Sequence, residues 1–154
     1  MSENVANTDT RFGKFEDIKN EIEKITGNII ISSIKAAEPI GPKKLLDALI
    51  IAPCTGNTLG KLAGGITDTS VTMAAKAILR NEKPVIIAVS TNDGLAGSAK
   101  NIGYLLNARN IYFVPYGQDD AINKPRSLVA DMEQILPTLK QALKSKQIQP
   151  ILLK

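Results

Sequence analysis

Small polar residues directly after a short apolar run form the segment of this sequence best suited to ligand binding. The apolar run covers residues 49–51, and Thr55, Gly56 and Thr58 follow it just before a helix-type spacing of apolar residues begins. The first amide groups of a helix lack partners within the helix, and the helix dipole adds partial positive charge there. Such a strand-turn-helix junction therefore favours an anionic or strongly polar ligand. The alternative is a plain turn in which Asn57 or Thr58 caps the helix, and these residues alone leave both interpretations open.

Two more polar segments follow apolar runs further along the chain. Ser90, Thr91 and Asn92 directly follow the second apolar run, and Gln118 follows the third. Hydroxyl and amide groups of these types donate hydrogen bonds to carboxylates and to ring oxygen or nitrogen atoms. Asn92 is the best single candidate of the second segment. Asp93, which is followed by a glycine, is typical of a tight turn, and we interpret it as a turn residue in preference to a catalytic group.

Two charged residues near the first polar segment have competing interpretations. Lys61 falls one turn into the expected helix, where it either adds positive charge to a binding site or is an ordinary surface lysine. Asp68 comes where the chain turns between two expected helices. It is either a ligand-binding carboxylate or the N-cap of the second helix.

The absence of histidine restricts the chemistry that the chain can perform. With no histidine and with Cys54 as its one cysteine, the sequence excludes Ser-His-Asp and Cys-His nucleophile systems and argues against a zinc site, so we expect no metal. An acid or base has to be a carboxylate, a lysine, a tyrosine, the substrate or a cofactor. Because no base neighbours Cys54 in the sequence, we interpret it as a packed small residue.

Alternating helix and strand patterns predict the elements that position these residues. Apolar runs predict strands over residues 47–52, 84–89 and 111–114, and the middle run is apolar throughout, as in a strand buried on both faces. Because helices separate the strands, we expect an α/β fold with a doubly wound parallel sheet in three layers. The carboxyl ends of parallel strands share one edge of the sheet, so the three polar segments would line one site. Helices are predicted over residues 14–25, 57–64, 70–81, 98–107 and 127–144, the last bent by Pro137, with a helical turn at residues 29–34.

Composition indicates one domain with a small-molecule role. The 154 residues are 44% hydrophobic, which is enough for a single core over residues 1–154. No run approaches the roughly 18 apolar residues of a membrane span. The net charge of +4 comes from scattered lysines and arginines, and the chain has only three tyrosines and three phenylalanines to stack on bases. We therefore expect no nucleic-acid partner and no membrane association, and the lone cysteine suits the cytoplasm.

Residues 53–58 have the sequence Pro-Cys-Thr-Gly-Asn-Thr, and Lys61 and Asp68 follow at short spacing. This segment resembles the Pro-Ala-Ser-Ala-Asn-Thr signature of the flavoprotein family that includes cysteine decarboxylases and flavin prenyltransferases. Further blocks, in order along nearly the whole chain, are similar to the B-subunit group of dipicolinate synthases within that family. These blocks are residues 8–13, 37–43, 90–95, 110–120 and 146–152.

The resemblance implies a flavodoxin/Rossmann-like fold and a protein that acts with a partner, the dipicolinate synthase A subunit, which carries NADP. Together the two would oxidise dihydrodipicolinate, a small dicarboxylate, to dipicolinate (pyridine-2,6-dicarboxylate) in the mother cell of a sporulating bacterium. The resemblance also implies FMN as a cofactor and a trimer-based homo-oligomer. The alternatives are an FMN-binding decarboxylase or prenyltransferase, and a non-catalytic assembly component.

The resemblance implies binding residues but no identified catalytic residue. It gives cofactor-binding and substrate-binding roles to residues of the three polar segments and their flanks. The cofactor-binding residues are Pro53, Thr55, Gly56, Asn57, Thr58, Lys61 and Asp68, and the substrate-binding residues are Ser90, Thr91, Asn92 and Gln118.

Two features depart from the pattern of the resembled family. Its members normally begin with a strand, a Gly-Ser-rich loop and a helix before the block at residues 8–13, whereas only ten residues precede Arg11 here. We therefore expect an N-terminally incomplete sheet whose open strand edges are available to another chain. The oxidative decarboxylases of the family use a catalytic histidine, so their mechanism does not operate unchanged in a chain without histidine.

Overall fold

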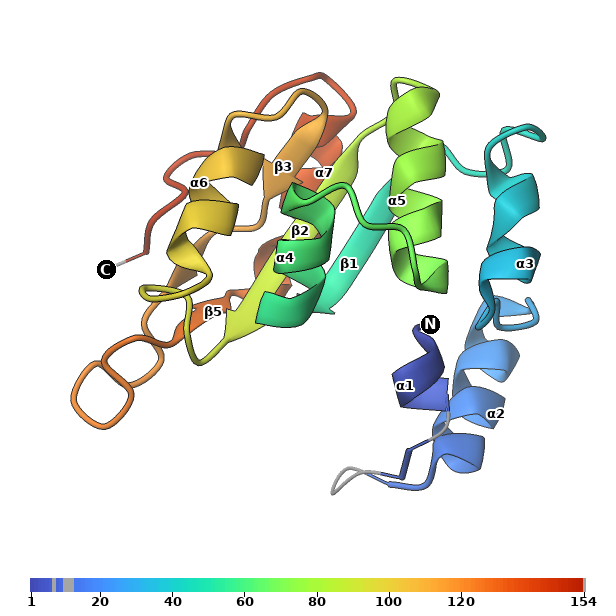
Figure 1. Cartoon of the computed structure of the whole chain (residues 1–154), viewed down its shortest axis with the longest axis horizontal. Helices are drawn as coiled ribbons and strands as arrows, with labels where there is room; N and C mark the ends of the chain where they lie inside the picture. Colours follow the sequence, from blue (N-terminus) through green and yellow to red (C-terminus); the bar gives the residue numbers. More distant parts are fainter. Residues whose placement is uncertain (7, 10–12, 154) are drawn as a thin grey trace.

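A mixed five-stranded sheet forms the centre of the protein (Figure 1). The computed structural model describes residues 1–6, 8–9 and 13–153, so residues 10–12 of the block at residues 8–13 lie outside the described residues. Three strands are parallel, with β2 (Val85–Thr91) between β1 (Leu49–Cys54) and β3 (Ile111–Phe113). These three confirm the predicted parallel sheet.

An antiparallel extension continues the sheet from the carboxyl end of β2. That end pairs with β5 (Leu128–Ala130), and β5 pairs with β4 (Tyr116–Gly117). Ser90 lies opposite Val129, and Val129 lies opposite Gly117. The doubly wound pattern did not predict this extension, which makes the sheet mixed.

Helices cover both faces of the sheet and confirm the three-layer arrangement. One face carries α4 (Gly56–Ala63), α5 (Ser70–Arg80) and α6 (Ala99–Leu106), and the opposite face carries α7 (Ile135–Ala142) (Figure 1). The helices predicted at the positions of α4, α5 and α6 agree with the structure to within one residue at each end.

The central strand β2 is the core of the domain, as its apolar run predicted. Its residues from Val85 to Val89 are fully buried, because strands flank it on both sides and helices cover both faces. Burial of each large aliphatic side chain contributes about 1.5–3 kcal/mol relative to exposure. Phe113 of β3 packs beside this strand, and its ring centroid lies 6.0 Å from that of Tyr116.

Local capping signals explain where two helices begin or end. In front of α5, the Thr69 hydroxyl accepts the amide of Thr72 at 3.1 Å, and the Thr72 hydroxyl accepts the amide of Thr69 at 3.2 Å. This reciprocal capping box satisfies amides that the first turn leaves unpaired. The helix α2 (Phe15–Thr26) ends at Gly27, which has a left-handed φ of 66°. Glycine adopts that conformation without steric cost, so the predicted stop is confirmed.

Two predicted elements are wrong. Residues 127–144 do not form one helix, because the chain forms β5 first, then the 3-10 turn η2 (Met132–Gln134), and only then α7. Pro137 lies in the first turn of α7, where its missing N–H breaks no helical bond, and it therefore causes no interruption. The helical turn predicted at residues 29–34 is absent, since Ser33 caps the next helix by accepting the amide of Ala36 at 3.2 Å.

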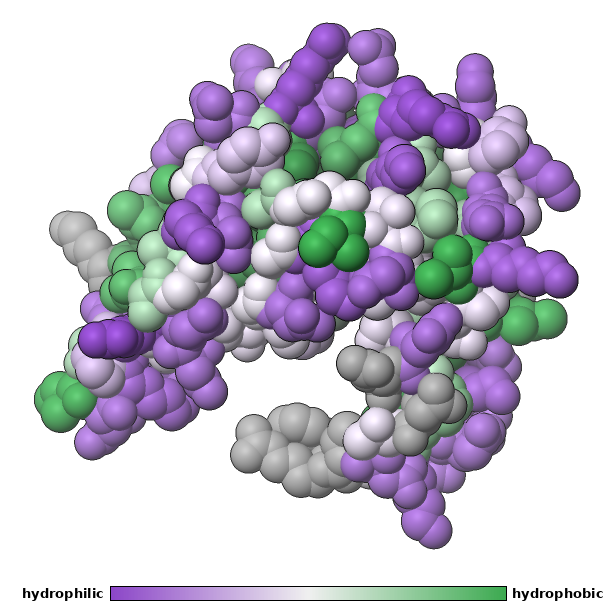
Figure 2. All heavy atoms as spheres, in the orientation of Figure 1, coloured by the Kyte–Doolittle hydropathy of each residue, from purple (hydrophilic) through white to green (hydrophobic). Residues whose placement is uncertain are grey.

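The described residues among the first forty form an arm beside the sheet domain (Figure 1). The arm contains α1 (Glu3–Ala6), α2, α3 (Ile34–Ala37) and η1 (Glu38–Ile40). It packs on α5 through α3 and η1, where Ala37 and Ile40 are buried. Among the described residues, none of α2 is buried. Figure 2 shows an open hollow between the arm and the lower edge of the domain.

Candidate functional site

The loop after β1 places the first predicted segment at the start of α4. The Thr55 hydroxyl lies 3.5 Å from the amide of Thr58 and caps the helix, which begins at Gly56. The prediction that Asn57 or Thr58 is the cap is therefore wrong. The Asn57 side chain is exposed on the first turn of α4.

Pro53 lies within β1 and not in the loop after it. The strand continues to Cys54, two residues beyond the predicted end, and the pairing with β2 shifts register between Ile51 and Cys54. A proline is tolerated at such an irregularity because the regular pairing is already interrupted there, so the missing N–H of the proline removes no hydrogen bond between the strands. Pro53 is exposed, and it precedes the helix without contacting β2 through a regular pair.

The loop after β2 contains a hydrogen-bonded carboxylate. The side-chain oxygen Oδ1 of Asp93 accepts hydrogen bonds from the Thr91 hydroxyl at 2.5 Å and from the Ser98 hydroxyl at 2.9 Å. These hydrogen bonds lower the pKa of Asp93 below its ordinary value, and the bond from Thr91 has the largest effect. The Asp93 carboxylate thus links the end of β2 to the residue before α6. Asn92, between Thr91 and Asp93, is exposed.

The first two predicted segments meet at Gly56. A Cβ atom added to Gly56 would lie 2.7 Å from Oδ1 of Asp93 and 2.8 Å from the hydroxyl oxygens of Thr91 and Ser98. The first residue of α4 therefore packs directly on the loop after β2. Asn57 and Asn92 flank this contact, so the structure brings the two loops together as predicted.

Asn57 and Asn92 have unengaged side chains. Over the part of the chain that the structure describes, neither amide takes part in a hydrogen bond, and both are exposed. The hydroxyl of Thr91 is bound to Asp93, and that of Thr55 to the first turn of α4. The two amides are therefore the polar groups of these loops that are available to a ligand.

Lys61 and Asp68 neutralise each other. The Lys61 ammonium lies 2.8 Å from Oδ1 of Asp68 and 2.9 Å from Oδ2. The pair connects α4 to the segment before α5. Thr69, and not Asp68, caps α5, so the N-cap interpretation of Asp68 is wrong. With its charge compensated, Lys61 offers less attraction to an anionic ligand than an unpaired lysine would.

Gln118 lies apart from the contact at Gly56. It follows Gly117 of β4, which is separated from β2 by β5, and two strand spacings place it about 10 Å from β2. Its amide donates to the carbonyl of Pro125 at 2.9 Å, within the loop that joins β4 to β5. Its hydrogen bond thus holds Gln118 to its own loop. That loop is joined to the loop after β2, because the carbonyl of Arg126 accepts the amide of Leu95 at 3.0 Å.

Cys54 is buried beneath the loop after β1. It is fully inaccessible to solvent, and burial raises the pKa of its thiol to about 12. The thiolate form is therefore scarce near neutral pH, and the interpretation of Cys54 as a packed residue is confirmed.

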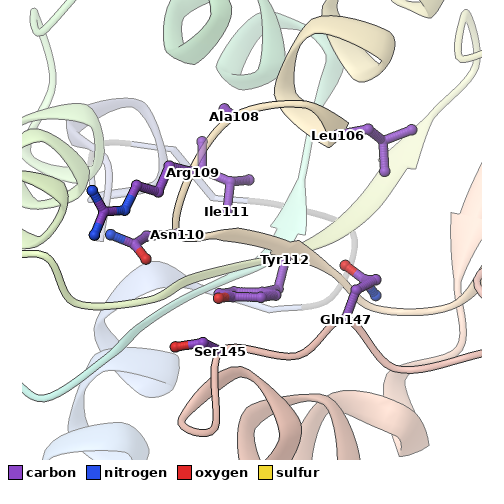
Figure 3. Close-up of a pocket in the computed structure, with 8 residues that line it drawn as sticks. All are labelled: Leu106, Ala108, Arg109, Asn110, Ile111, Tyr112, Ser145 and Gln147. Atoms are coloured by element: carbon purple, nitrogen blue, oxygen red, sulfur yellow. The ribbon is translucent and has the colours of Figure 1, made fainter.

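A separate pocket lies at the opposite end of the sheet (Figure 3). It has a volume of about 490 Å³ and is lined by Asn110, the residue before β3, and by Ile111, the first residue of β3. The predicted segments instead lie at the carboxyl ends of strands. In Figure 3, Tyr112 of β3 borders the pocket on one side, and Gln147, in the chain after α7, borders it on another. The guanidinium of Arg109 lies at its rim, 3.6 Å from Glu82. This pocket does not contain any predicted site residue.

The described residues hold no candidate metal cluster. In the ranges 1–6, 8–9 and 13–153, no three acidic or cysteine side chains come together as ligands. None of the helices formed by those ranges has the length and apolar character to cross a membrane.

Sequence patterns missed the role of Asp93 and Ser98. The interpretation of Asp93 as a turn residue explains its backbone conformation, but it does not predict that its carboxylate accepts hydrogen bonds from the hydroxyls of Thr91 and Ser98. The spacing of these residues could have indicated the role. Thr91, two residues before Asp93, and Ser98, five residues after it, both reach the carboxylate of Asp93 because a helix follows the turn.

Comparisons with known proteins agree on one family. The Flavoprotein family matches residues 4–139. The chain is 48% identical to the B subunit of dipicolinate synthase from Bacillus subtilis (strain 168), over 97% of this chain and 74% of that protein. It is 31% identical to flavin prenyltransferase UbiX of Thermoplasma acidophilum over 54% of this chain and 46% of that protein.

Solved structures give the same result. The B subunit of dipicolinate synthase from Bacillus halodurans C superposes with a TM-score of 0.89 at 48% identity, covering 97% of this chain and 77% of that one. The FMN binding protein AtHal3 gives a TM-score of 0.53 at 25% identity, covering 71% and 60%. The FMN-dependent cysteine decarboxylase SpaF, at 24% identity and a TM-score of 0.56 over 80% and 71%, shares the fold.

Proposed function

Because this chain belongs to the Flavoprotein family and, within it, to the B-subunit group of dipicolinate synthases, we propose that it binds the dicarboxylate at the loops after β1 and β2. The reaction is the oxidation of dihydrodipicolinate to dipicolinate in spore formation. In it the ring loses a hydride and a proton and becomes aromatic. This chain orients the ring for the reaction. Because it has no histidine, none of its side chains acts as a histidine base.

The observation that supports this site is the availability of two amides on adjacent loops. Asn57 and Asn92 flank the contact of Gly56 with the loop after β2, and their N–H groups are unengaged in the described part of the chain. An amide N–H donates to a carboxylate oxygen, and two such donors on separate loops orient a flat dicarboxylate better than one. Ser90 and Thr91 border this position from β2, and Gln118 is proposed as a more distant substrate contact.

The proposal extends to partners and location. We assign NADP, the hydride acceptor, to the A subunit, as the resemblance to the dipicolinate synthases implies. In this chain Lys61 of α4 is already paired with Asp68 and offers little charge to a nucleotide phosphate. The relatives are named as one subunit of a synthase, which supports a partner protein. A trimer-based homo-oligomer and the mother-cell cytoplasm of a sporulating bacterium complete the proposal.

The site fits one part of a flavin better than another. In place of the dicarboxylate, the amides of Asn57 and Asn92 would suit the polar edge of an isoalloxazine ring, which carries both donors and acceptors. The start of α4 suits the flavin phosphate less well, because the Asp93 carboxylate already packs against Gly56 and Lys61 is paired with Asp68. A flavin bound here supplies an acceptor for two electrons, and Pro53, Thr55 and Thr58 would border its ring.

The test of the proposed function is reconstitution with the A subunit. We expect dihydrodipicolinate oxidation only when both proteins are mixed, and we expect Asn57→Ala and Asn92→Ala each to lower kcat/KM about tenfold or more, as loss of one orienting hydrogen bond costs roughly 1.5 kcal/mol. Asn107→Ala is the matched control, because Asn107 is an exposed asparagine at the end of α6. Full activity of both site variants would refute the assignment.

A flavin-binding enzyme without a partner is the second candidate function. The similarity to the FMN binding protein AtHal3 favours it. The absence of histidine opposes the oxidative decarboxylase mechanism of the wider family. A visible absorption spectrum of the purified chain, followed by titration with FMN, separates this candidate from a non-catalytic assembly component, which would give no flavin spectrum and no activity with the A subunit.

A further inference from the structure

Asp93 lies at a junction of three elements. Its carboxylate accepts the hydroxyl hydrogen bonds of Thr91, at the end of β2, and of Ser98, directly before α6. The backbone carbonyl of Asp93 also accepts the amide of Ser98 at 3.2 Å. Ser98 is only 2% exposed, so the junction is anchored in the interior on one side although Asp93 itself is exposed.

The third element is α4, which approaches through Gly56. The three oxygens of Asp93, Thr91 and Ser98 occupy the space that a Cβ atom of Gly56 would need, at 2.7–2.8 Å. Real Cβ atoms do not come so close to other atoms, so glycine is required here by close approach and not by its backbone conformation. The positive end of the α4 dipole also favours a negative charge at this point.

No cation holds Asp93 in place within the described residues. The ion pairs of the described chain do not include it, and its side-chain hydrogen-bond donors are two neutral hydroxyls. The hydrogen-bonded geometry therefore depends on the acceptor oxygen and not on a salt bridge. Asparagine retains such an oxygen at the same position, whereas alanine does not.

We propose that Asp93 is a positioning residue of the ligand site: by fastening the loop after β2 to α6 and to Gly56 of α4, it holds Asn92 and Asn57 in a fixed relation to each other. Asn92 precedes Asp93 directly, and Asn57 follows Gly56 directly. The inference deepens the proposed function, because its consequence for binding rests on the role of these two amides.

The first experiment measures the junction without any ligand. Amide hydrogen exchange of Thr58, Leu59 and Ser98 is followed by NMR in the isolated chain and in the variants Asp93→Ala and Asp93→Asn. We expect exchange at these amides to accelerate at least tenfold in D93A and less than threefold in D93N. Asp47→Ala is the control, since Asp47 pairs with Lys83 at the opposite end of the sheet. Unchanged exchange in D93A overturns the proposal.

The second experiment measures the consequence for the site. Binding of dipicolinate, the unreactive product, to the complex with the A subunit is measured by calorimetry below the unfolding temperature of every variant. We expect D93A to weaken the affinity about tenfold and D93N to restore it to within about threefold of the parent. A merely structural Asp93 would lower the melting temperature of D93A and leave its affinity unchanged, and an equal loss in D93N would show that charge, not position, matters; either result overturns the proposal.

Gly56→Ala provides an independent approach from the other side of the contact. We expect G56A to reproduce the exchange and binding changes of D93A, and the double variant G56A/D93A to add little to either single change, because both disturb one contact. Additive effects contradict the proposal. If the parent complex fails to bind dipicolinate, the proposed function is wrong, while the exchange experiment still decides whether Asp93 fastens the loops.

Discussion

Side chains of the same type have different availability in this protein. Asn57 and Asn92 are exposed and unengaged in the described structure, whereas Asn81 and Asn123 bind neighbouring groups of the chain. The carboxylates of Asp68 and Asp93 are both engaged, but with different partners, because Asp68 neutralises Lys61 while Asp93 accepts hydrogen bonds from two hydroxyls. The role of a residue thus follows from what its polar atoms already bind, and free donors are the ones left for a ligand.

The pH dependence of stability tests the state of Asp93. The hydroxyls of Thr91 and Ser98 lower the pKa of this carboxyl in the folded protein. The unfolded chain therefore binds the proton at higher pH, and the stability that Asp93 contributes is complete above its ordinary pKa of about 3.9 and is lost as the pH falls through the folded value. We expect the melting-temperature difference between the parent and D93N to be constant above about pH 5 and to shrink toward pH 3.

Thermal unfolding followed by circular dichroism from about pH 6 to about pH 3 measures this difference. Asp119 and Asp120 also have lowered pKa values, through hydrogen bonds from Ser127 and from the Asn123 amide respectively, and they remain in both proteins. Their contribution therefore cancels in the comparison. A difference that does not change with pH contradicts the assigned hydrogen-bonding of Asp93.

At the scale of elements, the two outer edges of the three parallel strands differ in how their backbone groups are paired. On the free side of β3, the Gln147 side chain accepts the amide of Phe113 at 2.8 Å and donates to the carbonyl of Phe113 at 2.7 Å. One side chain thus replaces a neighbouring strand. β1 pairs with β2 on one side, and Ile50 in it is 37% exposed. An open edge of this kind is a place for another chain to pair.

Replacement of Gln147 tests its role as an edge cap. We expect Gln147→Ala to lower the free energy of unfolding by about 1–3 kcal/mol, because both backbone groups of a buried residue lose their partners. Urea denaturation measures the change, and Lys146→Ala, an exposed neighbour, is the control that we expect to change stability by less than about 0.5 kcal/mol. Equal stability of the two variants contradicts the capping role.

At the scale of the molecule, a well-packed domain carries a loosely packed arm. The core of the sheet domain is fully buried around β2, whereas α2 has no buried residue. Ile25, near its carboxyl end, and Ile29, three residues after that end, are 75% and 87% exposed. The helix α2 therefore receives little support from tertiary contacts, whereas α3 and η1 of the same arm pack on α5. Short helices without such support are marginal in water.

Hydrogen exchange of the isolated chain tests this difference in local stability. We expect the amides of α2 to exchange at least ten times faster than those of α5, because α5 packs six buried residues against the domain and α2 packs none. Exchange followed by mass spectrometry on peptides that cover each helix measures the two rates. Equal protection of α2 and α5 would show that the arm is stabilised by contacts beyond those described.

The sequence by itself determined the alternation of helices and parallel strands, the buried central strand and the meeting of the loops after β1 and β2. These features follow from periodicity and from the rule that parallel strands end at one edge, so local patterns suffice to predict them. The roles of Gln118 and of the other binding residues stay predictions.

Only the tertiary structure decided the features that depend on distant partners. Residues 128–130 form a strand because β2 and β4 lie beside them, and the charge of Lys61 is compensated because Asp68 reaches it. Gly56 has no room for a side chain, because three oxygens from another loop occupy that space. In each case the atoms that make the contact belong to a residue whose position cannot be predicted from spacing in the sequence. The reason is that the energy of a contact depends on distance in space and not on separation along the chain.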